Sequence, residues 1–100
     1  MKIAYTLWTW LMDEYNGWKP PTPNPKQDFE RSLREISDLN YSLFENFNVL
    51  ATLYEDSPEE FDQLLAKYGM EFVCIYHYFT ANFEADMSYG ERCCKFLARH

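Results

Sequence analysis

Two short, aromatic-rich stretches of the sequence carry polar side chains that can exchange protons or bind hydroxyl groups. Residues 41–47 include Glu45 and Asn46, and residues 70–79 include His77 near their C-terminal end. The aromatic and β-branched residues in both stretches favour strands. In folds built from βα repeats, side chains at the carboxyl ends of strands bind ligands and do chemistry. Glu45, Asn46 and His77 are therefore candidate site residues.

The helix expected to position the first of these strands covers residues 25–39. Phe29, Leu33 and Ile36 recur at helical spacing, with charged residues between them, so one face of this segment is apolar. Asn40 follows it and is a plausible left-handed C-cap. The strand at 41–47 then begins almost without a loop.

A second helix is expected at residues 57–68, before the strand at 70–79. The run Ser57-Pro58-Glu59-Glu60 is a capping box with proline at the first helical position. Gly69 is expected to stop this helix. Residues 49–56 are interpreted as a loosely apolar connection, and residues 80–87 as a loop that leads to a last helix at 88–99.

The N-terminal stretch, residues 2–10, is interpreted as a strand, with a buried helix segment as the competing assignment. Neither of the two alternating sets within residues 3–8 is charged, and residues 70–79 are almost continuously apolar. Both stretches are therefore expected to be buried on both faces. Residues 11–25 contain one glycine and four prolines, which predicts a long loop. Aromatic residues around this loop, Trp8 and Trp10 among them, either wall a pocket or cover the end of the core.

The predicted order is strand, loop, helix, strand, helix, strand, helix. Such alternation is typical of an α/β fold with a parallel sheet and right-handed crossovers. One hundred residues, of which 47% are hydrophobic, suffice for a single domain with a buried core. The sequence therefore predicts one domain, residues 1–100, of three βα units.

Charge and cysteine content exclude several classes of function. The net charge is −7, so the basic stripe that nucleic-acid binding requires is missing. The acidic residues are spread along helix faces, which favours solubility over mimicry of a polyanion. Three cysteines, two of them adjacent, do not suggest a secreted disulfide framework. No apolar run reaches the length of a membrane span, so we expect a cytoplasmic protein.

Three stretches together resemble a known family. They are KIAYTLWTW, DFERSLREISDLNYSLFENF and SPEEFDQLLAKYGMEFVCIYHYF, and they cover almost the whole chain. Their order and spacing are similar to the N-terminal part of the sugar phosphate isomerase/epimerase family, the xylose isomerase-like TIM barrels. This resemblance implies the first three units of a (β/α)8 barrel, which in full needs about 250 residues. It also implies metal-assisted proton transfer on a sugar or polyol.

The resemblance assigns roles to the strand-end residues. Glu45 would bind sugar hydroxyls or move a proton beside a carbonyl, unless it is merely paired with a neighbouring donor. His77 matches a histidine that ends the third strand in this superfamily, although a structural histidine is the alternative. Trp8 and Trp10 would stack on a sugar ring or fill the core. The remaining substrate-binding candidates are Asn46 and Tyr78.

The family's divalent metal, of unknown identity, is held mainly by residues of later strands. We therefore expect no metal to be fully ligated by this chain, and little activity from the chain in isolation. The expected partners are a sugar-like small molecule and either a second copy of the chain or the remaining barrel segment. The alternative is a non-catalytic self-associating or protein-interaction module in which another chain completes an unpaired sheet edge.

Overall fold

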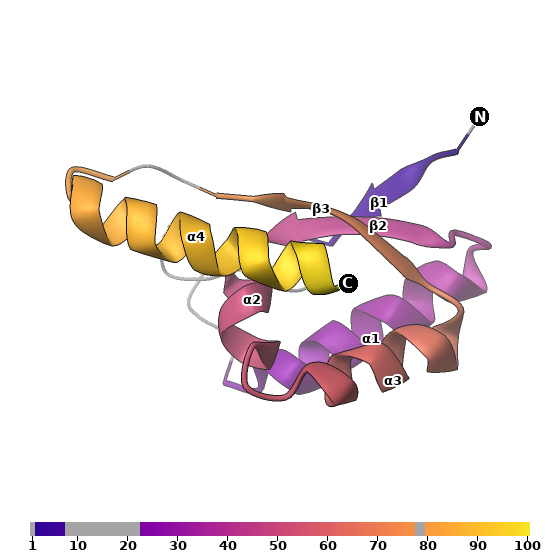
Figure 1. Cartoon of the computed structure of the whole chain (residues 1–100). Coiled ribbons are helices and arrows are strands. Elements are labelled where there is room, and N and C mark those ends of the chain that lie inside the picture. Colours follow the sequence, from indigo (N-terminus) through magenta and orange to yellow (C-terminus); the bar gives the residue numbers. More distant parts are fainter. Residues whose placement is uncertain (1, 8–22, 78–79) are drawn as a thin grey trace.

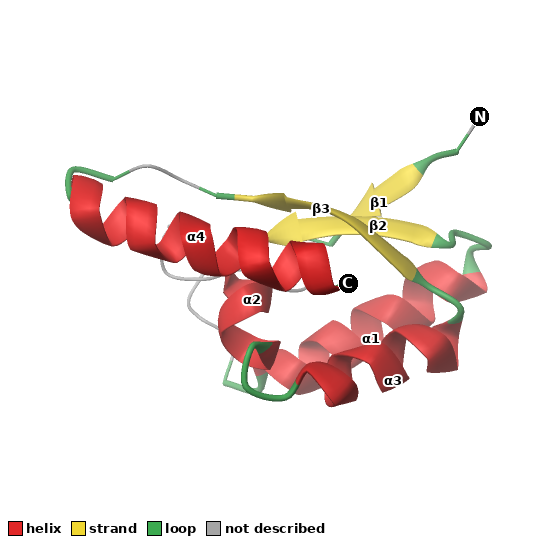
Figure 2. Cartoon of the chain, in the orientation of Figure 1, coloured by secondary structure: helices red, strands yellow, loops and turns green. Residues whose placement is uncertain are grey.

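The computed structural model of the chain describes residues 2–7, 23–77 and 80–100. Within these residues the protein is α/β, with a three-stranded parallel sheet and four helices (Figures 1 and 2). The strands are β1 (Ala4–Thr6), β2 (Leu43–Phe47) and β3 (Glu71–Tyr76). The helices are α1 (Pro25–Asp38), α2 (Val49–Tyr54), α3 (Pro58–Tyr68) and α4 (Phe83–Arg99).

The sheet has the predicted parallel arrangement. β2 pairs with β1 on one side and with β3 on the other, so the spatial order of the strands follows the sequence. Among the described elements, the helices lie together on one side of the sheet, below it in Figure 1. The other side, which we call the open face, is covered by no described element.

The prediction that the strands are buried on both faces is wrong for β3. Phe72 is 4% exposed and contributes to the core, whereas Val73 and Tyr76 are 40% and 42% exposed. The reason is the single layer of helices, which buries only the side chains that point towards it. A continuous apolar run therefore did not imply two covered faces.

A β-bulge in β3 decides which side chains reach the open face. Phe44 of β2 pairs with Phe72, but the next residue, Glu45, pairs with Cys74, so Val73 is an extra residue. Because strand side chains alternate between faces, one extra residue exchanges the faces of all that follow. Tyr76 is consequently exposed on the same side as Glu45, and the next residue, His77, lies on the side of α4.

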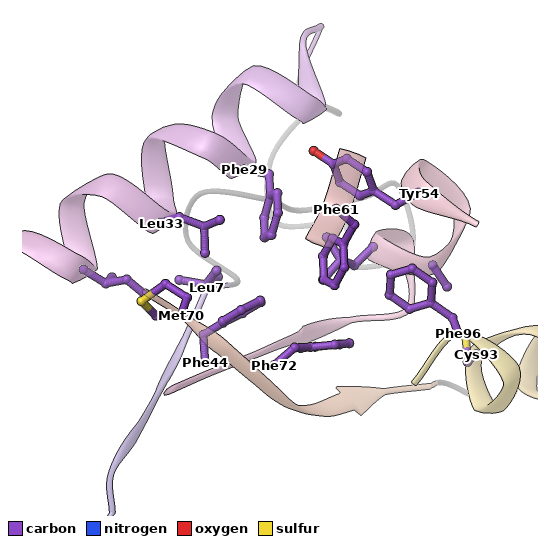
Figure 3. Close-up of a cluster of buried hydrophobic side chains, with 13 residues drawn as sticks. Leu7, Phe29, Leu33, Phe44, Tyr54, Phe61, Met70, Phe72, Cys93 and Phe96 are labelled. Atoms are coloured by element: carbon purple, nitrogen blue, oxygen red, sulfur yellow. The ribbon is translucent and has the colours of Figure 1, made fainter. Parts of the chain in front are cut away.

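The core between the sheet and the helices is built around aromatic rings (Figure 3). The ring centroid of Phe61, in α3, lies 5.8 Å from that of Phe29, 5.3 Å from that of Tyr54 and 4.9 Å from that of Phe96. Phe72 of β3 closes the cluster, with its ring edge-to-face to that of Phe61 at 5.7 Å. Phe61 thus connects all the layers of the fold.

The two helices predicted most specifically have nearly the expected bounds. The apolar stripe of α1 is fully buried, since Phe29, Leu33 and Ile36 are each 0% exposed. Its end is also as predicted: Asn40 has a φ of 67° and donates its backbone N–H to the carbonyl of Ser37. Gly69, with a φ of 63°, ends α3 in the same left-handed conformation.

Two segments interpreted as non-helical are helical instead. Residues 49–54 form α2, and α4 begins at Phe83 rather than at residue 88. The start of α4 is set by Asn82, whose side-chain oxygen accepts a hydrogen bond from the backbone N–H of Ala85. α2 has no side-chain cap and is held by burial of one face, formed by Leu50, Ala51 and Tyr54.

The strands are shorter than predicted, and one predicted cap is not formed. β1, β2 and β3 occupy parts of the expected ranges 2–10, 41–47 and 70–79. Residues 8–10 and 78–79 lie outside the described part of the chain. Ser57 precedes α3 as expected, but its side chain makes no cap; its hydroxyl accepts a hydrogen bond from Lys26.

Candidate functional site

Glu45 lies on the open face of the sheet and is held by residues of both neighbouring strands. Thr6 of β1 and Tyr76 of β3 each donate a hydroxyl hydrogen bond to its oxygen Oε1. The bond from Tyr76 is 2.9 Å long. The three side chains come from β1, β2 and β3, so the parallel pairing of the sheet is what assembles this cluster.

The geometry leaves one oxygen of the Glu45 carboxylate available. Both hydroxyls bind Oε1, and no described residue donates a hydrogen bond to Oε2. A carboxylate held at one oxygen is oriented, while the other oxygen can accept a hydroxyl group or a proton from a ligand. Glu45 is therefore the described side chain best placed for chemistry on the open face.

His77 is not brought together with Glu45, because it lies on the other side of the sheet, against α4. Its Nε2 is 2.8 Å from the backbone carbonyl of Asp86, and its Nδ1 is 3.1 Å from the side-chain nitrogen of Asn48. Its ring also packs on that of Tyr89, with the centroids 5.4 Å apart. These contacts use both ring nitrogens, so His77 joins the end of β3 to α4.

The other predicted site residues are not gathered around Glu45. Asn46 is fully buried on the side of the helices, as expected for the residue next to Glu45 in a strand. The predictions for Trp8, Trp10 and Tyr78 fall outside the described residues. Of the six candidates, Glu45 is thus the one described on the open face.

Sequence reasoning missed the residues that surround Glu45 and His77. Thr6 and Tyr76 carried no signal because their position opposite Glu45 depends on strand register and on the bulge. Asn48 did carry one, since it is a polar residue directly after a predicted strand. Asp86 and Tyr89 contact His77 from α4. Their proximity could have been predicted only if α4 had been expected to begin at Phe83.

A polar pocket of about 570 Å³ lies between the carboxyl end of β3 and the first half of α4. Asp86 forms part of its wall and is 6% exposed. The Asp86 carboxylate accepts hydrogen bonds from the backbone N–H and the hydroxyl of Thr80, at 2.6 and 2.8 Å. Tyr89 borders the pocket too, and its hydroxyl donates to the backbone carbonyl of Asn48 at 2.9 Å.

A larger groove of about 910 Å³ runs between α1 and α3, away from both clusters. Ion pairs on its rim join the two helices: Lys26 with Glu60 at 2.7 Å, and Lys67 with Glu30 at 2.8 Å. These pairs hold the pKa values of Glu60 and Glu30 below the ordinary value through their lysine hydrogen bonds. Since each charge already has an opposite partner, we interpret this groove as a helix-packing feature.

The described residues do not form a metal site. No group of three or more histidine, cysteine or carboxylate side chains is close enough among them to hold a metal ion. Glu45 would supply one carboxylate to the divalent metal of the resembled family, whereas such ions take about six ligands. The described donors therefore do not fit that metal, and we derive no step through it.

The adjacent cysteines of α4 differ in their surroundings, as expected for neighbours on one helix. Cys93 is buried and Cys94 is exposed. Burial raises the pKa of the Cys93 thiol to about 11, so this group stays protonated at neutral pH. Cys94 is the one of the pair that can meet an oxidant.

The ion pair between Glu55 and Arg92 makes stability depend on pH. Arg92 hydrogen-bonds the Glu55 carboxylate and lowers its pKa below the ordinary value of 4.5. A lowered folded-state pKa adds stability above the unfolded-state pKa, and this is lost as the pH falls through the folded pKa. Glu55→Gln should therefore lower the free energy of unfolding by about 0.5–1 kcal/mol at pH 7. The difference from wild type should vanish in acid.

Urea denaturation of both proteins at several pH values measures this effect. Glu91→Gln is the control. Glu91 pairs with Lys95 at an exposed position of α4, the helix that contains Arg92, so its replacement should lower the free energy of unfolding less. If the stability loss in Glu55→Gln were equally large below the folded-state pKa of Glu55, the pH dependence could not come from its ion pair with Arg92.

The fold and the Glu45 cluster define an α/β protein whose parallel sheet presents an oriented carboxylate on its open face. No described helix is long and apolar enough to cross a membrane. Comparisons of the chain with family models, curated proteins and solved structures found no match. The functional assignment consequently has to come from the residues themselves.

Proposed function

We propose that the chain is the N-terminal part of a sugar phosphate isomerase/epimerase-like TIM barrel, with Glu45 in its substrate pocket. The observation that supports this most is the position of Glu45 on the open face of a sheet whose parallel strands follow sequence order. In a TIM barrel, helices cover only the outer face of such a sheet, and the inner face lines the barrel.

The proposed chemistry is proton transfer beside the carbonyl of a sugar or polyol. Thr6 and Tyr76 hold Oε1 of Glu45, so Oε2 accepts the proton from the carbon next to the carbonyl. His77 was expected beside Glu45 but lies on the other side of the sheet, where it joins β3 to α4.

A nuclear magnetic resonance titration of the ¹⁵N-labelled chain with neutral pentoses and hexoses tests this proposal. Saturable shifts are expected at Thr6, Glu45 and Tyr76. Glu45→Gln keeps the shape but removes the charge, and hydrogen bonds to charged groups contribute about 1.5–3 kcal/mol. The variant should therefore bind at least about ten-fold more weakly. Asp38→Asn, an exposed carboxylate at the end of α1, is the control.

Two results would contradict the proposal. One is the absence of any sugar-dependent shift on the open face. The other is binding that Glu45→Gln leaves unchanged while the variant keeps the wild-type circular dichroism spectrum, because the carboxylate would then have no part in recognition.

A second candidate function is a self-associating or protein-interaction module. It is favoured by Val73 and Tyr76, which are large and exposed on the open face. Light scattering on a size-exclusion column distinguishes the two functions. A discrete dimer that Val73→Glu converts to monomer supports the module, whereas a monomer that binds sugars supports the enzyme part. We place either form in the cytoplasm because the three cysteines are free thiols.

A further inference from the structure

The pocket between β3 and α4 contains a buried hydrogen-bond acceptor that no described residue satisfies. Asn48 lines this pocket and is 3% exposed. Its side-chain oxygen Oδ1 is buried and has no hydrogen-bond partner in the described structure. A buried polar atom without a partner destabilises a fold by about 1–3 kcal/mol, so such atoms usually receive a hydrogen bond from water or a ligand.

The orientation of the Asn48 amide follows from the hydrogen bonds around His77. The backbone carbonyl of Asp86 can only accept, so Nε2 of His77 must carry the proton. In the neutral ring Nδ1 is then an acceptor, and the Asn48 atom 3.1 Å from it must be the donor Nδ2. The unsatisfied atom is therefore Oδ1, which needs a donor such as a hydroxyl group.

The two charged side chains that line the pocket already have hydrogen-bond partners. The guanidinium of Arg92 binds both carboxylate oxygens of Glu55. The carboxylate of Asp86 accepts two hydrogen bonds from Thr80. The rest of the wall includes hydroxyl and amide side chains such as Ser88 and Asn82, beside the ring of Tyr89. The described lining therefore offers hydrogen bonds but no unpaired cation, which suits an uncharged, hydroxylated molecule better than an anion.

The position of the pocket is also favourable for binding. It lies at the carboxyl end of the sheet, where Asn48 follows β2 and His77 follows β3. Open α/β sheets bind their ligands in crevices at this end. The pocket is nevertheless distinct from the open face, because His77 and Glu45 lie on opposite sides of the sheet.

We propose that this pocket binds a small neutral polyol, one hydroxyl of which donates to Oδ1 of Asn48. A second hydroxyl lies within reach of Ser88, and the apolar face of the ligand rests on the ring of Tyr89. This site does not depend on the function proposed for Glu45, since it shares no residue with the cluster on the open face.

The test is a ¹H–¹⁵N titration of the full chain with sorbitol and, separately, with gluconate, which has the same carbon chain but a negative charge. With sorbitol, saturable shifts are expected at the Asn48 side-chain amide, Ser88 and Tyr89. Gluconate should bind more weakly, because the Asp86 carboxylate forms part of the wall and Arg92, the cation in the described lining, is already paired with Glu55. Shifts at Asn48, Ser88 and Tyr89 that follow one binding curve, distinct from that of any shifts at Thr6, Glu45 and Tyr76, separate this site from the one on the open face.

Two substitutions examine the contacts. Asn48→Leu keeps the approximate shape but removes the acceptor, and it should abolish the sorbitol shifts. Ser88 is exposed on α4, so alanine there should not disturb folding. Ser88→Ala should weaken sorbitol binding about five-fold, the equivalent of one neutral hydrogen bond of about 1 kcal/mol. Gln63→Ala, an exposed polar residue of α3, is the matched control and should have no effect.

The proposal is overturned if sorbitol produces no saturable shift and the Asn48 amide shows cross-relaxation only with water, because an ordered water alone would then fill the pocket. It is also overturned if gluconate binds more tightly than sorbitol. If Asn48→Leu does not fold, the test rests on the shifts of the wild-type chain and on Ser88→Ala. The site is rejected if sorbitol shifts only residues outside this pocket and Ser88→Ala binds sorbitol as tightly as wild type.

Discussion

Replacement of Phe61 by alanine is expected to lower the free energy of unfolding by about 3–5 kcal/mol. Phe61 is 0% exposed and its ring contacts rings from α1, α2, β3 and α4. Its removal leaves a cavity at the point where these elements meet, and the surrounding rings cannot all move to fill it. Such a loss is a large part of the 5–15 kcal/mol that stabilises a typical domain.

Urea denaturation followed by circular dichroism measures the effect. Phe83→Ala is the matched control, because Phe83 is the same residue type but is 72% exposed, and its loss should change stability by less than about 0.5 kcal/mol. If Phe61→Ala does not fold, Phe61→Leu should still show a loss of about 1 kcal/mol or more. Equal effects at positions 61 and 83 would show that this core is wrongly assigned.

Replacement of Gly69 by alanine is expected to lower the free energy of unfolding by about 1–2 kcal/mol. Gly69 has a φ of 63°, and a methyl group added there would meet nothing within 4 Å. The expected loss therefore comes from backbone strain alone. Thermal unfolding and urea denaturation both measure it.

Asn40→Gly is the control of opposite sign. Asn40 has a φ of 67° at the equivalent place after α1, so glycine there relieves strain. The relief of strain stabilises the folded chain, while the entropy that glycine adds to the unfolded chain partly offsets this gain. The free energy of unfolding should therefore be unchanged or higher by a few tenths of a kcal/mol. A stability loss in Asn40→Gly as large as that in Gly69→Ala would contradict a backbone origin.

Local signals predicted much of this fold. The apolar stripe of Phe29, Leu33 and Ile36 identified α1 and its buried face, because helical spacing alone determines which side chains share a face. Gly69 marked the end of α3 for an equally local reason. The alternation of these helices with aromatic strands was sufficient to predict the parallel sheet.

The segments that sequence reasoning missed lack such signals or depend on distant contacts. α2 is six residues long and has no side-chain cap, so its helical form rests on packing of Tyr54 and its neighbours against the core. The Ser57 hydroxyl was expected to cap α3, but Lys26, far away in the sequence, hydrogen-bonds to it. Tertiary contacts explain the helical form of α2.

The candidate site shows the same division. Glu45 was identifiable because a carboxylate near the end of an apolar strand is unusual. Its partners Thr6 and Tyr76 were not, because they meet it only through strand register. The separation of His77 from Glu45 was equally hidden, since it depends on one extra residue in the middle of β3.

Because of that extra residue, the pairing of β3 decides which of its side chains lies beside Glu45. If β3 kept its length but paired without the bulge, Val73 would lie opposite Glu45, Tyr76 would turn towards α4, and His77 would turn towards the open face beside Glu45. Deleting Val73, by contrast, would keep Cys74 opposite Glu45 and leave both side chains on their present faces. The presence or absence of the bulge at constant strand length thereby decides whether a phenol or an imidazole lies next to the carboxylate, without a change in either residue. In any sequences aligned with this one, a gap at Val73 would therefore preserve the site, whereas a strand of equal length without the bulge would have a different side chain beside the carboxylate.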